Sequence, residues 1–218
     1  CNFCTVDENG GVTDRRAGRI PTEKNAELCG RLRGIRIPGV EIFILPGKEH
    51  RFAVVFRGEG LGGEVNDTDP QKVGLKPREA APLSPDSART AAVINEFVAQ
   101  AKTILADSLP ANMILFRGIS RRPNLPQMGE VFKLSPAAIA SYPMYRGLAR
   151  LVGMKVLSTG STFAEELDTL AAHWTEHDFF YVHYKATDTA GEDGDFARKF
   201  HAIEEADALI PRIIAPNP

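Results

Sequence analysis

Four carboxylates crowd into the segment KATDTAGEDGD, residues 185–195, and they are Asp188, Glu192, Asp193 and Asp195. Asp188 follows a strand expected over residues 179–183, and we expect the loop after it to turn sharply at Gly191. Carboxylates at the end of a strand often bind hard divalent cations, because they supply charge and oxygen donors at fixed reach. Carboxylates also suit the start of a helix, here expected over residues 196–210, where the helix dipole favours negative charge. The pattern alone leaves a metal site and a solvated helix start both open.

Arginines form a second candidate binding group. Arg57 and Arg117 each end an apolar strand and precede a glycine, in the matching segments FRGEG and FRGIS. A planar guanidinium in that position can bind a carboxylate or phosphate through two contacts while the glycine lets the backbone approach closely. Further arginines cluster in two loops, and they are Arg15, Arg16, Arg19, Arg121 and Arg122. The alternative is that each is solvated or pairs with Glu59, Glu64 or Asp67.

The sequence matches other known functional motifs poorly. The glycines of residues 58–63 match neither the dinucleotide-binding nor the P-loop pattern, so nucleotide binding has little support. Cys1 and Cys4 have C-x-x-C spacing, but no second Cys or His pair follows at zinc-site spacing. Serines and histidines occur without the G-x-S-x-G setting of a hydrolase. His183 lies in the apolar run FFYVHY and is expected in the core rather than at a metal.

The composition is that of an ordinary globular protein. The 218 residues are 43% hydrophobic and 25% charged, and the net charge of -2 gives no electrostatic reason to expect nucleic acid. No apolar run reaches the roughly 20 residues that span a bilayer, and no signal peptide is recognisable. Three cysteines, an odd number, are typical of reduced thiols. We therefore expect a cytoplasmic protein with neither nucleic acid nor a membrane as its partner.

The expected order of helices and strands changes near residue 120. Before it we expect an α+β unit, with strands over residues 1–7, 11–14, 40–45, 52–57 and 112–117, and helices over 22–33 and 84–107. Thr22 is the expected N-cap of the first helix. After it we expect alternating elements, with strands over residues 137–141, 155–157 and 179–183, and helices over 144–152, 162–177 and 196–210. Such alternation predicts a parallel sheet covered on both faces, which collects ligands at the carboxyl ends of its strands.

Five segments together carry a family resemblance, and they are NFCTVDENGGVTDRRAGRIPTE, VVFRGEGLGGEVNDTDP, NMILFRGISRRPNLP, PMYRGLARLVGM and VHYKATDTAGEDGDFARKFHAIEEAD. In this order they resemble the archaeal-type 2,3-bisphosphoglycerate-independent phosphoglycerate mutases of the alkaline phosphatase superfamily, over essentially the whole chain. The resemblance implies an α/β fold. Residues 121–218 would be part of an alkaline-phosphatase-like metal domain with a parallel sheet, and residues 1–120 an inserted α+β substrate-binding domain.

The resemblance also implies a reaction, the interconversion of 2-phosphoglycerate and 3-phosphoglycerate in glycolysis and gluconeogenesis through a phosphoserine intermediate. In this family two divalent metal ions, manganese, magnesium or zinc, activate the serine, and arginines hold the carboxylate and phosphate of the substrate. The expected partner is therefore a small phosphorylated substrate. Assembly into a homo-oligomer stays open.

Position by position, the resemblance assigns roles to eight residues. Asp188 matches the metal-ligand aspartate of the family pattern D-x-x-G-H-D-G-D. Glu192 stands where the family usually has a histidine ligand. A carboxylate oxygen is a harder donor than imidazole, so Glu192 favours manganese or magnesium over zinc if the site is retained. The residues assigned to substrate binding are Asp14, Arg15, Arg16, Arg57, Arg117 and Arg146.

The resemblance further leads us to expect that the chain is a fragment. The family's N-terminal metal aspartate and nucleophilic serine are expected before Cys1, and an Asp-His metal pair after Pro218, so no catalytic residue is assigned within the chain. Two alternatives stay open. One is another phosphoryl-transfer enzyme of the same superfamily. The other is a non-catalytic ligand-binding relative that has lost its metals, a reading that Glu192 favours.

We predict that the purified 218-residue chain has no mutase activity, because phosphoryl transfer needs a nucleophile that the chain is not expected to contain. The measurement is the conversion of 3-phosphoglycerate to 2-phosphoglycerate with added manganese. Turnover above a protein-free blank would contradict this expectation.

Overall fold

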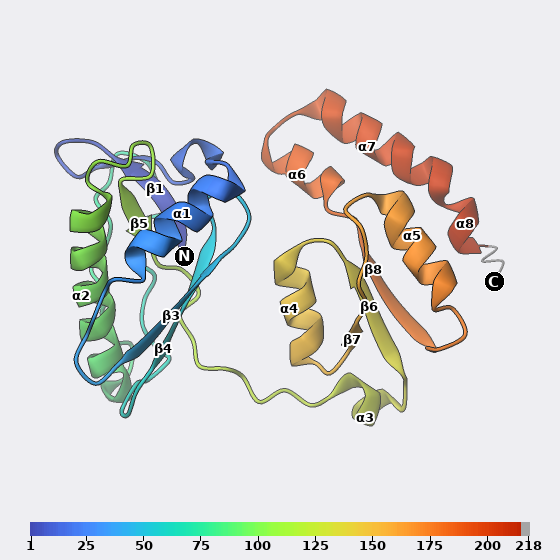
Figure 1. Cartoon of the computed structure of the whole chain (residues 1–218), viewed down its shortest axis with the longest axis horizontal. Coiled ribbons are helices and arrows are strands. Elements are labelled where there is room, and N and C mark those ends of the chain that lie inside the picture. The colour runs from blue at the N-terminus through green and yellow to red at the C-terminus, as the bar shows by residue number, and fades with distance from the viewer. Residues whose placement is uncertain (215–218) are drawn as a thin grey trace. The chain divides into compact units, whose positions relative to one another are not determined.

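The computed structural model describes residues 1–214 of the chain (Figure 1). It divides into two compact units, Cys1–Arg122 and Pro123–Pro218. The division lies two residues after the boundary expected at residue 120. The roles that the resemblance assigns to the two parts stay predictions. None of the helices in residues 1–214 is long and apolar enough to cross a membrane.

The first unit is built on two antiparallel sheets, one of three strands in the order β2-β1-β5 and one in which β3 pairs with β4. The bounds of the strands are β1 Asn2–Val6, β2 Val12–Asp14, β3 Glu41–Pro46, β4 Phe52–Arg57 and β5 Met113–Leu115. The hairpin expected at the start of the chain is confirmed, since Thr5 of β1 pairs with Asp14 of β2. Gly10 in its turn has a φ of +80°, a conformation that glycine adopts without steric cost.

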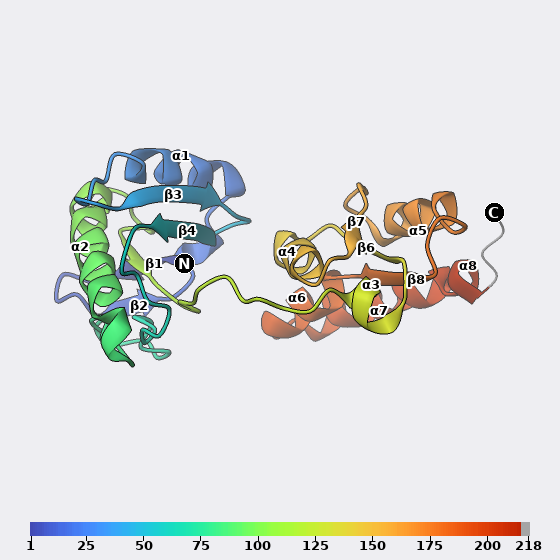
Figure 2. The same ribbon diagram turned by 90° about the horizontal axis from the view of Figure 1, so that it is seen from below.

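Two helices, α1 (Thr22–Leu32) and α2 (Ala88–Leu105), cover these sheets, with the short 3₁₀ turns η1 (Ala17–Arg19) and η2 (Pro85–Ser87) before them. Figure 2 shows α1 lying along β3, and α2 packs against β5. The residues of α2 that are buried recur at helical spacing, and they include Ala91, Ile94, Phe97, Ala101 and Leu105. The helix is therefore held by one apolar face, as its sequence pattern predicts.

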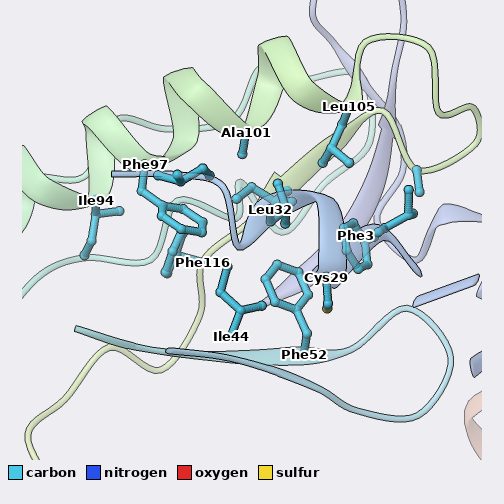
Figure 3. Close-up of a cluster of buried hydrophobic side chains, with 14 of the residues drawn as sticks. Phe3, Cys29, Leu32, Ile44, Phe52, Ile94, Phe97, Ala101, Leu105 and Phe116 are labelled. Carbon is cyan, nitrogen blue, oxygen red and sulfur yellow. The ribbon is translucent and has the colours of Figure 1, made fainter. Parts of the chain in front are cut away.

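An aromatic cluster lies in this core beside the candidate arginines, and Figure 3 shows two of its members, Phe97 and Phe116. Phe97 of α2 meets Phe56 of β4 and Phe116 after β5 edge to face, with ring centroids 5.5 and 5.7 Å apart. Phe56 also stacks on Phe116 at 5.9 Å. Arg57 and Arg117 each follow one of these phenylalanines directly, so the core fixes the backbone from which both arginines extend.

The second unit contains a parallel sheet in the order β7-β6-β8, as predicted from the alternation of strands and helices. Its strands are β6 Pro136–Ala140, β7 Lys155–Val156 and β8 Phe179–His183. Its helices are α3 Met128–Phe132, α4 Pro143–Leu151, α5 Phe163–Ala172, α6 Ala186–Glu192, α7 Phe196–Leu209 and α8 Pro211–Ile214. The unit therefore has an α/β fold, and α4 and α5 each begin shortly after a strand ends.

The central strand β6 is buried along its whole length, which explains its continuous apolar sequence PAAIA. Side chains alternate between the two faces of a strand. Ala137 and Ile139 pack into a cluster with residues of α5 and α7. Ala138 packs on the other side with Ala149 of α4. Helices thus cover both faces of the sheet, and the carboxyl ends of its strands are left for the loops that follow.

Three local expectations are wrong. Thr22 is the first residue of α1 rather than its N-cap, and its hydroxyl instead accepts a hydrogen bond from the Glu49 amide at 3.2 Å. Helix α5 ends at Ala172 rather than at His177, and a turn follows it. The segment that holds Asp188 is the short helix α6 rather than a sharply turning loop. The reason is that the Lys185 carbonyl accepts from the Thr189 amide at 3.1 Å and starts a helical turn at once.

Candidate functional site

The two FRG segments of the first unit meet at one cavity of about 530 Å³. Its polar walls come from the two strand ends and the residues after them, namely Arg57, Gly58, Arg117, Gly118, Arg121 and Arg122. The apolar walls include Phe56, Ile94 and Phe116. Four arginines among the lining residues, beside this apolar floor, suit the cavity to a small anionic molecule, although Arg121 Nε and Nη2 also donate to the Leu61 carbonyl. The matching FRG segments are therefore brought together in space.

Arg57 is positioned by the facing strand. Glu41 pairs with Arg57 in the register of β3 and β4, and its Oε2 lies 3.5 Å from Arg57 Nη1. The guanidinium also lies over the ring of Phe43, 4.9 Å from its centroid. Because the Arg57 side chain is 71% exposed, both contacts are weakened by solvent. Arg57 is thus oriented by its neighbours but remains accessible to a ligand.

Arg117 is positioned by Asp69, a carboxylate with 0% side-chain exposure. Arg117 Nε lies 3.4 Å from Asp69 Oδ2, and the Arg117 side chain is 46% exposed. The sequence had suggested Asp67 as a partner for the arginines. In the structure the Asp67 carboxylate instead accepts a hydrogen bond from the Gly118 amide at 2.8 Å.

The segment Asp14-Arg15-Arg16 also reaches Asp69. Arg15 Nε and Nη2 donate to the two oxygens of Asp69 at 2.9 and 2.7 Å, in a two-point contact. The Asp14 carboxylate accepts from the amides of Arg16 and Gly18 at 2.7 and 2.6 Å, so it shapes the loop that presents Arg15. Both oxygens of Asp14 are engaged with its own loop.

Opposing effects act on the pKa of Asp69. Burial alone raises the pKa, but hydrogen bonds from Arg15 and the Gln71 amide, together with the charges of Arg15 and Arg117, outweigh it and hold the pKa below its ordinary value. Asp69 is therefore ionised at neutral pH and neutralises part of the positive charge around it.

The six residues predicted to bind substrate fall into three groups. Arg57 and Arg117 line the cavity. Asp14, Arg15 and Arg16 form the loop that is tied to Arg117 through Asp69. Arg146 lies on α4 of the second unit, where it is half-buried. Sequence reasoning missed Asp69, although the segment NDTDP that contains it was part of the family resemblance.

The predicted metal ligands lie after the carboxyl end of β8. Asp188 and Glu192 are one turn apart on α6, which places them on the same face of that helix. Asp188 forms an ion pair with Lys185, and its side chain is 53% exposed. Two oxygen ligands at this spacing suit a hard divalent cation. Within residues 1–214 no group of three or more His, Cys, Asp or Glu side chains could hold a metal ion, so α6 supplies at most part of a site.

The other carboxylates of the segment act on helix α7. Asp195 is its N-cap and accepts a hydrogen bond from the Arg198 amide at 3.0 Å. Asp193 pairs with the Arg198 side chain at 3.1 Å. The expectation of a helix-start carboxylate is confirmed for Asp195, whereas Asp193 is the C-cap of α6. His183, which ends β8, is half-buried and stacks on Tyr145 with ring centroids 3.5 Å apart.

Comparison with known proteins identifies the family. Residues 1–112, just over half of the chain, match the sequence model of the 2,3-bisphosphoglycerate-independent phosphoglycerate mutases. The chain belongs to this family. It is 50% identical to a probable 2,3-bisphosphoglycerate-independent phosphoglycerate mutase of Thermus thermophilus and 49% identical to one of Thermotoga maritima. The matches cover 100% of this chain but 55% and 54% of the relatives, so the chain spans about half the length of the curated relatives that it matches.

Solved structures agree with this assignment. The cofactor-independent phosphoglycerate mutase of Thermoplasma acidophilum is 30% identical, with a TM-score of 0.62 over 98% of this chain and 59% of that one. The PH0037 protein of Pyrococcus horikoshii is 20% identical, with a TM-score of 0.68 over 98% and 53% of the two chains, and shows likeness of fold alone. The mixed α/β architecture with a parallel sheet is therefore that of the mutase family.

His50, close to the arginine-rich loop of this mutase-family chain, should make stability depend on pH. It is 1% exposed, and burial, together with the charges of Arg51, Arg16 and Arg19, lowers its pKa from 6.5 to about 4. Between pH 6.5 and 4 the imidazole of His50 binds a proton in the unfolded chain but not in the folded chain. The free energy of unfolding is therefore at its full value above pH 6.5 and decreases as the pH falls toward 4. At about 1.4 kcal/mol per pKa unit the loss reaches about 3 kcal/mol.

The measurement is the free energy of unfolding in urea at pH 7, 6, 5 and 4. His50→Gln should lack this part of the acid loss, whereas His201→Gln, at a residue whose side chain is 77% exposed, should keep it. Equal acid losses in the unsubstituted chain and His50→Gln would contradict the assignment.

Proposed function

We propose that the complete protein containing this chain interconverts 2-phosphoglycerate and 3-phosphoglycerate through a phosphoserine intermediate. The observation that carries the proposal is the cavity at which Arg57 and Arg117 meet Arg121 and Arg122. Family membership supports the same reaction, since the similar proteins are named as phosphoglycerate mutases. The nucleophilic serine is expected outside this chain.

The charges of the substrate match this cavity. Phosphoglycerate carries a carboxylate and a phosphate, and arginine binds both groups through pairs of charge-assisted hydrogen bonds. We assign Arg57 and Arg117 to direct contact with these groups, because both line the cavity. Asp14, Arg15 and Arg16 support the contact through the loop that reaches Asp69. Arg146, on α4, is proposed as a further substrate-binding residue.

We further propose that two divalent ions take part and that Asp188 and Glu192 contribute ligands to them. When bound, such ions lower the pKa of a nucleophilic hydroxyl and neutralise the charge of the transferred phosphoryl group. Asp188 and Glu192 offer carboxylate oxygens on one face of α6, a donor set that favours manganese or magnesium over zinc. Lys185 contacts Oδ2 of Asp188, so ligation by Asp188 uses Oδ1 unless this ion pair opens.

A second candidate function is a ligand-binding relative without metal. The ion pair between Lys185 and Asp188 favours it, because the lysine charge satisfies the carboxylate that a metal would need. Glu192 in place of the usual histidine favours it as well. Such a protein would keep the arginine cavity and bind phosphoglycerate without turning it over.

Substitution of the cavity arginines tests substrate binding. In the complete protein we expect Arg117→Ala and Arg57→Ala each to raise the KM for 3-phosphoglycerate about tenfold or more, because each loses charge-assisted hydrogen bonds worth about 1.5–3 kcal/mol. The control is Arg36→Ala, since the exposed Arg36 side chain donates to the nearby carbonyls of Arg33 and Ile35. Steady-state kinetics measures all three. A KM within twofold of the unsubstituted protein for both cavity variants would contradict the proposed site.

Metal titration separates the two candidate functions. We expect Asp188→Asn to weaken manganese binding about tenfold or more, because the ligand loses its charge, while Asp193→Asn binds as the unsubstituted protein does. Asp193 is the matched control because it lies on the same segment but pairs with Arg198. Calorimetric titration of the complete protein with manganese measures both affinities. Equal affinity in both variants would show that Asp188 is not a ligand, and no manganese binding by the unsubstituted protein would favour the ligand-binding relative.

A further inference from the structure

Asp69 is a buried carboxylate that joins two arginines from distant parts of the chain. Arg15 approaches both of its oxygens, and Arg117 Nε lies 3.4 Å from Oδ2. The Gln71 amide donates to Oδ1 at 2.8 Å. Each oxygen of Asp69 therefore faces two nitrogen atoms, which fixes the orientation of the carboxylate.

The residues before Asp69 fix the backbone around Arg117. The Thr68 amide donates to the Phe116 carbonyl at 3.0 Å, and the Phe116 amide donates to the Thr68 hydroxyl at 2.8 Å. The Asp67 carboxylate accepts from the Gly118 amide at 2.8 Å. Three consecutive side chains of the segment NDTDP thus contact the residue before Arg117, the residue after it and Arg117 itself.

Stability alone does not account for this arrangement. Removing the Asp69 carboxylate from water costs free energy that its attraction to two partly exposed arginines recovers only in part, and apolar residues of similar volume often stabilise a fold as well. The ion pair does fix geometry. Arg117 pairs with Asp69 through Nε and also lines the cavity, so its Nη1 and Nη2 donors can bind another anion there.

We propose that Asp69, clamped by Arg15, is a positioning residue that orients the Arg117 guanidinium toward an anionic group of the bound phosphorylated substrate. This inference rests on the proposed function, in which Arg117 contacts that substrate. Asp69 itself acts through Arg117 and does not touch the substrate.

The test is a double-substitution cycle in the complete protein, read as the KM for 3-phosphoglycerate. Asp69→Asn keeps the shape of the side chain but leaves one accepting oxygen, so Arg15 and Arg117 can no longer both be held. We expect its KM to rise about tenfold with kcat changed less than about threefold, and the double variant with Arg117→Ala to have the KM of Arg117→Ala alone. Asp107→Asn is the matched control, since it removes an Asp–Arg pair with Arg31 at the surface, and its KM should be unchanged.

Two results would overturn the inference. One is an Asp69→Asn variant with unchanged KM. The other is a double variant whose KM increase is the product of the two single increases, as for residues that act independently. If instead Arg117→Ala has no effect on KM, the proposed substrate contact fails as well, so the failure of the two proposals can be told apart.

A second variant covers the case in which Asp69→Asn does not fold. Arg117→Lys keeps the positive charge, but the flexible lysine side chain lacks the rigid planar fork that holds Nε toward Asp69 and the other two nitrogens toward an anion. We expect its KM to approach that of Arg117→Ala, with thermal unfolding close to that of the unsubstituted protein. A KM within about twofold of the unsubstituted value would show that charge alone suffices and would overturn the positioning role.

Discussion

The ion pair between the buried carboxylate of Asp69 and its two partly exposed arginines is the contact on which the arrangement of the candidate substrate site depends. It links the loop after β2, the segment NDTDP and the end of β5, which lie far apart in the sequence. Without the carboxylate, Arg15 and Arg117 would bring two like charges together at a half-exposed site. With it, the loop that carries Arg15 and the strand end that carries Arg117 are held in one geometry.

The aromatic core fixes the backbone next to the two arginines of the FRG segments. Phe56 and Phe116 pack on Phe97 of α2, and each directly precedes an arginine that lines the cavity. Apolar packing thus fixes where the two arginine side chains begin. The ion pair with Asp69 orients Arg117, whereas the exposed contact with Glu41 orients Arg57 only weakly. In each FRG segment the phenylalanine packs in the core and the arginine lines the cavity.

The spacing of apolar residues predicts most helices and strands, whereas contacts between residues far apart in the sequence could not be predicted. Helix α2 and the buried strand β6 follow from apolar spacing that is visible in the sequence. Asp69 could not be found in this way, because it lies 54 residues from Arg15 and no local pattern joins them. Helix α6 was missed for a different reason. Glycine and closely spaced carboxylates indicate a loop, but the contact between Lys185 and Asp188 lies across one helical turn and favours a helix.

We infer that the cavity at the two FRG segments binds phosphoglycerate through guanidinium groups that the protein has already oriented. The decisive experiment is a crystal structure of the complete protein with 3-phosphoglycerate. We expect a carboxylate or phosphate oxygen within hydrogen-bond distance of both Arg57 and Arg117, with the contacts of Asp69 to Arg15 and Arg117 unchanged. A ligand bound away from both arginines, or one whose binding breaks the contact between Asp69 and Arg117, would contradict it.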